Sequence, residues 1–415
     1  MQNRIQWGIA LLCAILAGPA SAEPPGSWTL EQAIRQGLAV SPEREIARQQ
    51  IEARRGQSAQ AGRWANPRLS LKASDELGRQ DGTGGYSLKE LEIAQALPLW
   101  GTLGHNRAAA RAGVEAARLD ATARRLRLEG RIASAFHDWQ LAAARHRLTQ
   151  QRREVAGRLA EIAELREEAG DLAERERLRI QVARSEAQRR HHHAEGKLTE
   201  ARTTLAGLLA VAPESLGRAP ELRAPPEPGE ALPPPSDHPA LQATEARIAS
   251  AREETEAARA EGWPDVELRL FSERNLFSGE RENSLGMGLM LELPLWDRNQ
   301  GAIQRARAEQ RIPVEEARAL RRDLHTRIRV SNQHLGHLLE ELHRHRSELL
   351  DPARRILEMT ERGYRAGEAT LLEWLEAENT WYSAREREQT ILAGAWKEWR
   401  QWRISTGRRL VEETP

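Results

Sequence analysis

The sequence predicts a mixed fold in which the β-strands of a membrane barrel continue into very long α-helices. Three observations predict it: an N-terminal export signal, a duplication of the mature chain, and strand-like segments followed by long helical runs in both halves. Charged residues make up 30% of the 415 residues and aromatic residues only 4%, which is typical of long helices or coiled coils. The formal net charge of +1 gives no bulk electrostatic support for nucleic-acid binding.

Residues 1–22 have the features of a secretory signal peptide. Arg4 supplies the positive charge, residues 9–16 an apolar stretch, and Ala20-Ser21-Ala22 a small-residue cleavage site. The apolar run is shorter than the about 20 residues that span a bilayer. The only cysteine, Cys13, lies inside this segment, so the mature chain has neither a disulfide nor a thiol nucleophile. We therefore expect a protein that is exported beyond the inner membrane.

The mature chain is duplicated at a spacing of about 197 residues. The matching pairs are Ser41-Pro42-Glu43 with His238-Pro239-Ala240, Trp64 and Pro67 with Trp263-Pro264, Leu97-Pro98-Leu99-Trp100 with Leu293-Pro294-Leu295-Trp296, and Ala169-Gly170-Asp171 with Ala366-Gly367-Glu368. Four ordered matches at one spacing indicate a duplicated unit, because the period is far too long for a solenoid. We predict a first repeat over residues 23–218, a proline-rich linker over 219–238 and a second repeat over 239–415.

Each half begins with a helix that is followed by two strand-like segments. The helices are predicted over Leu30–Ala61 and Pro239–Glu261. Apolar and polar residues then alternate over 68–74, 265–270 and 285–293, which is the period of a β-strand. Segments of about ten residues with one apolar face suit a transmembrane β-barrel that encloses water. A soluble hairpin with one buried face is the alternative; we favour the barrel because the chain is exported and offers these strands no other core to cover.

The third part of each half is a long helix that turns back into a second one. The predicted helices are Thr102–Ala169 with its return Leu172–Leu209, and Gly301–Arg365 with its return from Gly367 through Arg400. Small and apolar residues recur at intervals of three and four in the first of them, and at 1.5 Å per residue it reaches roughly 100 Å. Pro313 and Pro352 interrupt the pattern of the second long helix, so we expect a kink or break at each.

Four strands cannot close a barrel by themselves. An open sheet edge in lipid leaves backbone groups unpaired at a cost of several kcal/mol each, and single-chain barrels begin at about eight strands. The strands must therefore be completed by other copies of the chain, and rotational symmetry then arranges the helices in a ring as well. A ring of strands that continues into a ring of long helices is a tube.

The order helix, strand pair, long helix, glycine turn and returning helix, present twice, resembles the TolC-like outer membrane factors over essentially the whole mature chain. Residues 365–373 (RAGEATLLE) resemble the second periplasmic hairpin tip of that family. Residues 293–301 (LPLWDRNQG) resemble the strand-to-helix corner of its heavy-metal, CzcC-like branch. The residues at the two corners are Pro98, Trp100, Pro294, Trp296 and Gly301.

The resemblance implies a homotrimer, with four strands per chain completing a 12-stranded barrel in the outer-membrane lipid of a Gram-negative bacterium and a barrel of α-helices that extends into the periplasm. It implies a passive exit duct of a tripartite efflux system, with no enzymatic activity and no cofactor. The implied partners are a periplasmic adaptor (membrane fusion) protein and an inner-membrane resistance-nodulation-division pump. Membership of the CzcC-like branch would make the cargo heavy-metal cations.

The resemblance also assigns roles to residues of the two tips. The residues expected to dock the adaptor are Gly170, Asp171, Leu172, Arg365, Gly367 and Glu368. The acidic residues expected to ring the periplasmic entrance are Glu373, Glu376 and Glu176, and three copies of such carboxylates favour cations over anions. Arg179 departs from the acidic pattern in the first half, so the two tips are expected to be inequivalent.

Other functions remain open at this point. The same duct could serve drug efflux or type I secretion, and a different class of protein, a periplasmic coiled-coil adaptor or scaffold, would also contain long helical hairpins. No phosphate-binding loop, nucleophile motif or His-Glu-x-x-His pattern indicates an enzyme. The histidines at 191–193 and between His325 and His345 lack an evident carboxylate or cysteine to complete a site, so no specific metal site is predicted.

Overall fold

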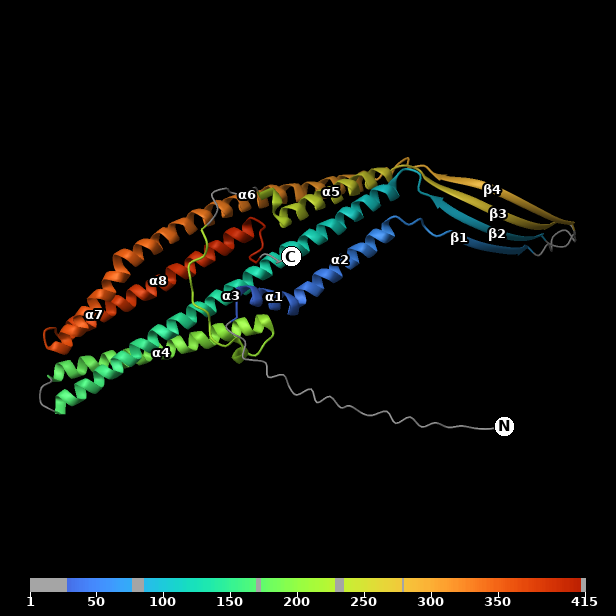
Figure 1. The fold of residues 1–415 in the computed structure, drawn as a ribbon. Coiled ribbons are helices and arrows are strands. Elements are labelled where there is room, and N and C mark those ends of the chain that lie inside the picture. Colours follow the sequence, from blue (N-terminus) through green and yellow to red (C-terminus); the bar gives the residue numbers. More distant parts are fainter. Residues whose placement is uncertain (1–27, 77–85, 169–172, 228–234, 278–279, 412–415) are drawn as a thin grey trace, which may run out of the picture.

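The computed structural model describes residues 28–76, 86–168, 173–227, 235–277 and 280–411. The chain is elongated, with a β-sheet at one end and long helices that extend away from it (Figure 1). The order helix, two strands, long helix and returning helix occurs in both halves. Among the described helices, none is long and apolar enough to cross a membrane. The predicted repeat and linker boundaries stay predictions.

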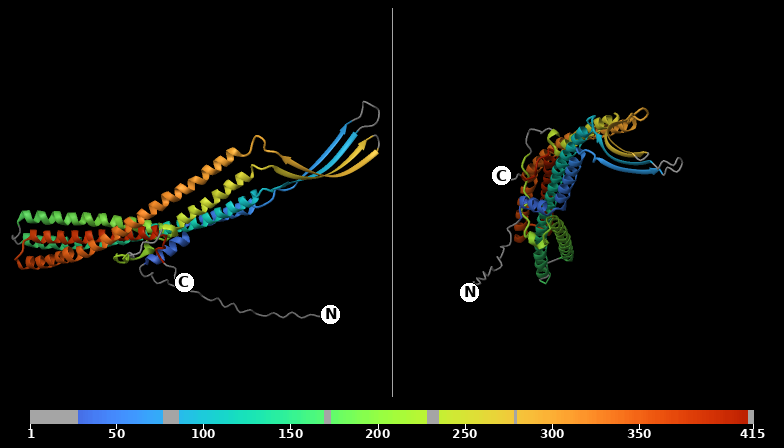
Figure 2. Two further views of the ribbon diagram at one scale, coloured as in Figure 1. Left: turned by 90° about the horizontal axis from the view of Figure 1, so that it is seen from above. Right: turned by 90° about the vertical axis from the view of Figure 1, so that its right-hand side faces the viewer.

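The four predicted strands form one antiparallel sheet in the order β1-β2-β3-β4. They are β1 (Arg68–Glu76), β2 (Tyr86–Leu97), β3 (Asp265–Phe277) and β4 (Glu280–Glu292). The two hairpins, one from each half, are joined where β2 pairs with β3, and the sheet is visibly curved (Figure 2). The prediction of four strands per chain is confirmed, and β1 and β4 are the edges of the sheet within one chain.

The two faces of the sheet differ in polarity because apolar and polar residues alternate along the strands, and the strand register places most of the apolar residues on the same face. One face is apolar and exposed, and its residues include Leu69, Leu71, Leu91, Ile93, Leu270, Leu285, Met287, Leu289 and Leu291. On the other face ion pairs join the strands. Lys72 of β1 pairs with Glu90 of β2 at 4.0 Å, Arg269 of β3 pairs with Glu92 of β2 at 3.9 Å, and Arg68 of β1 reaches across β2 to Glu267 of β3. An apolar outer face and a charged inner face are what a water-filled membrane barrel requires.

The long outgoing helix is continuous in the first half and interrupted in the second. The helix α3 (Thr102–Glu168) contains 67 residues, which corresponds to roughly 100 Å, and α4 (Glu174–Leu209) returns along it. In the second half the outgoing helix consists of α6 (Gln300–Arg344), a π-helical segment (His345–Leu350) and α7 (Asp351–Ala366), and α8 (Leu371–Ser405) returns. The long helices and their returns are therefore present as predicted.

The helix does not break at Pro313, where a kink or a break is expected. Pro313 is buried within α6, which continues without interruption on both sides of it. A proline inside a helix removes one backbone hydrogen bond at a cost of about 3 kcal/mol, and the packing of a helix of 45 residues offsets that loss.

At Pro352 the helix does change, although the change lies just before the proline. The wider turn of the π-helical segment leaves room for the ring of Pro352, which follows it as the second residue of α7. The segment is anchored to α8 by His345, whose Nε2 lies 2.8 Å from the Ala384 carbonyl oxygen, and by Arg346, whose Nε lies 2.7 Å from the Glu388 carboxylate. The axis changes direction between α6 and α7 (Figure 1).

The first predicted helix, Leu30–Ala61, is two helices. The helix α1 (Leu30–Val40) ends at Ser41, whose extended backbone caps the next helix, α2 (Pro42–Ala61). Ser41 accepts a hydrogen bond from the Glu43 N–H, and Pro42 provides the fixed φ that suits a first helical position. The prediction of one continuous helix was wrong because Ser-Pro both ends and begins a helix. Its counterpart in the second half, α5 (Pro239–Ala260), is a single helix that His238 caps in the same way.

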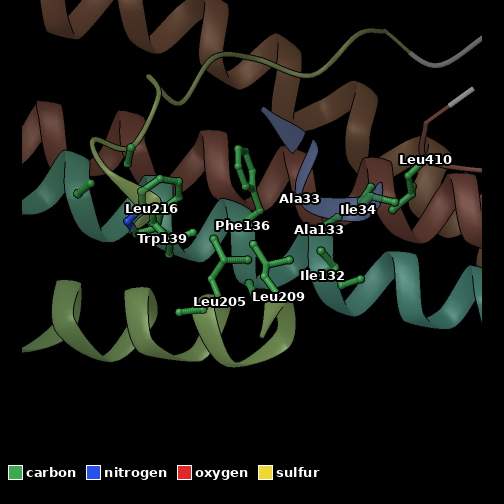
Figure 3. Packing of buried hydrophobic residues seen from close by; sticks show 14 of the residues in the cluster. Ala33, Ile34, Ile132, Ala133, Phe136, Trp139, Leu205, Leu209, Leu216 and Leu410 are labelled. Atoms are coloured by element: carbon green, nitrogen blue, oxygen red, sulfur yellow. The ribbon is translucent and has the colours of Figure 1, made fainter. Parts of the chain in front are cut away.

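The largest apolar core lies near the middle of the helical region rather than at either end. It joins α1, α3, α4, α6, α8 and the short 3-10 helix η1 (Pro213–Leu216). Figure 3 shows Trp139, Phe136 and Ile132 of α3 packed among side chains of the neighbouring elements, with Leu205 and Leu209 of α4 directly below them. This core holds the two helical hairpins together and so fixes how their distant ends are placed.

Candidate functional site

The end of the molecule opposite the sheet contains the two hairpin ends in which the sequence places the adaptor-docking tips (Figure 1). In the first tip, Gly170, Asp171 and Leu172 lie outside the described residues. In the second, α7 ends at Gly367, which adopts a left-handed conformation with φ 81° and ψ 8°. Glu368 N–H donates back to the Gly363 carbonyl at 2.8 Å, which closes the turn in the manner of a Schellman cap. Glycine is required here by its positive φ.

The turn presents charged side chains to solvent. Arg365 and Glu368 are both exposed, and Arg365 pairs with Glu361 on its own helix at 2.6 Å. Their docking role stays a prediction.

Glu373 belongs to the N-terminal cap of α8. Its carboxylate accepts hydrogen bonds from the Thr370 N–H at 2.7 Å and from the Thr370 hydroxyl at 2.9 Å, while its own N–H donates to Thr370 Oγ1 at 3.3 Å. These bonds, that from the backbone first, lower the pKa of Glu373. This capping box was not predicted from the sequence, although the Thr-x-x-Glu pattern that signals one is present. The carboxylate is charged and exposed, but it is turned back towards its own helix end.

Of the three predicted entrance carboxylates, only Glu376 lines the groove between the two hairpin ends. Glu376 is exposed and lines a groove of about 920 Å³ between α4 and α8, which Arg175 and Arg179 of α4 also line. Glu373 does not line that groove, and Glu176, half-buried in the first turn of α4, does not line it either. An entrance ring therefore depends on copies of the chain related by symmetry and stays a prediction.

A buried aromatic pair connects the two hairpin ends, and the sequence analysis did not single it out. Tyr364 of α7 and Trp374 of α8 stack with ring centroids 5.2 Å apart, on either side of the glycine turn. Arg166, near the end of α3, lies over the Tyr364 ring at 5.3 Å and its Nη1 lies 3.4 Å from the Tyr364 hydroxyl. The apolar residues packed with them are Leu159, Ala160, Ala163, Ile180 and Leu371. Two large aromatics flanking a turn, in a chain with 4% aromatics, were the available signal.

Behind this cluster lies a buried carboxylate on α8. Glu378 is 7% exposed, and its Oε1 has no hydrogen-bond partner in the part of the chain that the structure describes. Burial raises the pKa of Glu378, and nearby Arg152 opposes the rise. Arg152 itself lies over the Tyr382 ring at 5.2 Å and donates to Asn379. The group links α3 to α8 through charge as well as packing.

The strand-to-helix corners have different environments in the two halves. Trp100 stacks on Trp263 with centroids 5.1 Å apart and an interplanar angle of 24°, and its indole N–H donates to the Pro264 carbonyl at 2.6 Å. Trp296, the equivalent of Trp100, is 88% exposed. Pro98 and Pro294 follow the ends of β2 and β4, and Gly301 lies in the first turn of α6.

The histidines do not gather into a metal centre in the described part of the chain, where no group of three His, Cys, Asp or Glu residues could hold a metal ion. His146 and His191 have ring centroids 4.9 Å apart. His137 is buried against Trp396, with ring centroids 4.1 Å apart, and hydrogen bonds to Gln140; burial lowers its pKa to about 3. It is therefore a neutral packing residue at physiological pH.

Comparison with known proteins shows a family and a fold. Residues 33–211 and 236–396 match the model of the family described as outer membrane efflux protein. The nickel-cobalt-cadmium resistance protein NccC of Alcaligenes xylosoxydans xylosoxydans is 25% identical over 314 residues, which cover 75% of this chain and 70% of that protein.

Solved structures resemble the fold along most of its length. A membrane protein from Pseudomonas aeruginosa has a TM-score of 0.79 at 19% identity, over 92% of this chain and 90% of that chain. The outer membrane protein VceC of Vibrio cholerae has a TM-score of 0.76 at 19% identity, over 92% of this chain and 97% of that chain. Since the family model covers most of both halves and the strands and hairpins agree with it, the chain belongs to the outer membrane efflux protein family.

Proposed function

We propose that the chain is one third of a trimeric, passive exit duct that carries divalent heavy-metal cations out of the cell as part of a tripartite system. Membership of the family confirms an outer-membrane efflux channel that extends into the periplasm and is not an enzyme. The trimer, the partners and the cargo are the proposed part.

The observation that carries the proposal is the four-stranded sheet with opposite faces. Its apolar face is exposed, with Leu285 at 87%, while on the other face ion pairs join the strands, such as Arg269 of β3 with Glu92 of β2 at 3.9 Å. An exposed apolar face that extends over several strands is favourable in contact with lipid and unfavourable in contact with water. Edge strands in lipid need partners, so three copies that close a 12-stranded barrel satisfy both demands at once.

The helices then continue the barrel as a tube through the periplasm. With α3 reaching roughly 100 Å, the tips lie far from the membrane and close to where an adaptor and an inner-membrane resistance-nodulation-division pump would be met. A passive duct draws its energy from such a pump, and the exposed turn with Arg365 and Glu368 offers charged groups for the contact.

Two features support cations as the cargo. The relative NccC is named for nickel, cobalt and cadmium resistance, and Glu376 is an exposed carboxylate in the groove next to the second tip. Three copies of Glu373, Glu376 and Glu176 around one axis would attract cations and repel anions.

The test is a deletion strain that is complemented with the wild-type chain or with Glu376→Lys, which reverses the charge. Deletion is expected to lower the tolerated concentration of nickel, cobalt, cadmium or zinc, and Glu376→Lys to restore less tolerance than the wild type at equal amounts of trimer. Unchanged metal tolerance together with increased sensitivity to drugs, or with loss of a secreted protein, would assign the duct to another cargo. A protein found only as a soluble periplasmic monomer would contradict the duct itself.

A further inference from the structure

Two tryptophans stack on each other at the corner between the two halves of the sheet, and the duplication repeats both of them at the outer edges of the sheet. Within the chain, Trp100 after β2 stacks on Trp263 before β3, at the place where the first hairpin pairs with the second. The duplication places Trp296 after β4 and Trp64 before β1, which are the two outer edges of the sheet. Both are exposed, Trp296 at 88% and Trp64 at 59%, and neither ring contacts another aromatic ring within the described residues.

The register of the strands shows that these tryptophans are truly equivalent. Placing Trp100 on Trp296 and Trp64 on Trp263 moves the β1–β2 pair Arg68 and Ala94 onto Glu267 and Met290, which are themselves partners in the β3–β4 ladder. The two hairpins therefore superimpose residue for residue under this correspondence. The letter-for-letter repeat of Leu-Pro-Leu-Trp establishes which residues of β2 and β4 are equivalent. The pairing of residues in the two ladders then establishes which residues of β1 and β3 are equivalent.

Applied to the β2–β3 ladder within the chain, the same correspondence gives the residue pairs of a ladder between β4 of one subunit and β1 of the next. Gln95 pairs with Leu268 within the chain, so Leu291 is matched with the partner subunit's Leu69. Ala94 pairs with Arg269, so Met290 is matched with the partner subunit's Ser70.

The matched residues agree in face and charge. Apolar residues oppose apolar residues on the lipid side, and Glu292 opposes the partner subunit's Arg68 on the charged side, where opposite charges in a cross-strand pair are favourable.

The helices below the sheet leave the same gap. The helix α5 packs against both α3 and α6, whereas its equivalent α2 packs against α3 with no comparable second neighbour in the described part of the chain. The uncovered side of α2 includes Ile46, which is 51% exposed. A second copy that added its β4 to β1 would also bring its α6 to α2, in the relation that α3 has to α5.

We propose that a stack of Trp296 on the partner subunit's Trp64 joins neighbouring subunits at each corner, in the register that pairs Met290 with the partner subunit's Ser70. The inference rests on the proposed trimer and specifies its interface. The occupant is a second copy of this chain, because the internal stack and ladder provide a template that both edges match.

Cysteine cross-linking tests the register, since the mature chain has no cysteine of its own. Directly opposed residues on antiparallel strands have Cβ atoms about 4.5–5.5 Å apart, which a disulfide can bridge with small adjustment. Ser70→Cys with Met290→Cys is expected to give covalent trimers as the main product on mild oxidation in outer membranes. The matched controls, Ser70→Cys with Gly288→Cys or with Glu292→Cys, shift the pairing by two residues and are expected to cross-link at least tenfold less.

The outcomes separate the interface from the trimer. Efficient cross-linking of a shifted pair, or none of any pair in a wild-type background that forms trimers, would overturn the inferred register while leaving the trimer intact. A wild-type protein that forms no trimer would instead contradict the proposed function.

The stack is tested by Trp296→Ala, Trp64→Ala and the double variant, with dissociation of trimers followed by heating in detergent. Each single variant is expected to dissociate at a lower temperature and the double variant at nearly the same temperature as the singles, because both remove one contact. Trp296→Phe, which keeps a ring, is expected to restore most of the loss. Additive effects, or no effect, would show that the two tryptophans face lipid headgroups separately as an aromatic girdle, and would overturn the stack.

Discussion

Trp374→Ala is the change with the largest effect expected at the hairpin ends. The Trp374 side chain is 8% exposed, stacks on Tyr364 at 5.2 Å and packs in the cluster that joins α7 and α8 to α3 and α4. Replacing a buried tryptophan by alanine costs about 3–5 kcal/mol. At about 4 kcal/mol, the population in which the hairpin ends are separated rises about a thousandfold.

Hydrogen exchange on the detergent-solubilised protein measures the population in which the hairpin ends are separated. Amides of residues 357–375 are expected to exchange up to about a thousand times faster in the variant, while those of the central core around Trp139 are unchanged. The matched control is Leu372→Ala, two residues away on the same helix and 45% exposed, for which the cost is about 0.5 kcal/mol or less. Equal exchange rates in Trp374→Ala and Leu372→Ala would refute the role of the aromatic pair in holding the hairpin ends together.

Three further changes test separate features of the helical region. Glu129→Ala removes a fully buried carboxylate that holds Arg409 Nε and the Leu410 N–H at 3.2 Å each. We expect a loss of about 1.5–3 kcal/mol and faster proteolysis of the C-terminal segment, and an unchanged rate of proteolysis would contradict the anchoring role. Burial raises the pKa of Glu378, so the folded state keeps its proton to higher pH than the unfolded chain, and stability falls as pH rises through the folded pKa. Glu378→Gln cannot ionise and is expected to lack that fall between acid and neutral pH in thermal unfolding; an equal fall in both proteins would exclude it as the cause. Thr370→Ala removes the cap of α8 at a cost of about 1 kcal/mol and is expected to raise the pKa of Glu373 towards its ordinary value, which a carboxyl titration by NMR would detect; an unchanged pKa would show that the hydroxyl is not a donor.

Much of the second tip was predictable because its signals are local. Gly367 follows the last helical residue and adopts the positive φ that glycine permits, as the Ala-Gly-Glu motif indicated. Thr370 and Glu373 form a capping box that the sequence pattern already contained, although it was interpreted only as part of an entrance ring. The aromatic pair behind the turn was not predictable in the same way, because the partners that bury it come from α3 and α4, far away in the sequence.

The helix interruptions show where local rules are insufficient. Pro313 and Pro352 carry the same local penalty, yet α6 continues through the first, and a π-helical segment precedes the second. The difference lies in the surroundings: His345 and Arg346 find partners on α8 that stabilise the wider turn. Packing between helices therefore decided what the proline rule left open.

The duplication, the four alternating strands and the long helices could be predicted from the amino-acid sequence, because periodic burial and repeated motifs are properties of neighbouring residues. Which of the equivalent residues meet depends on the tertiary structure. Trp100 finds Trp263 inside the chain, whereas Trp296 and Trp64 remain exposed at the two outer edges. Such contacts join residues more than a hundred positions apart, and they depend on strand register and helix packing that no local pattern contains.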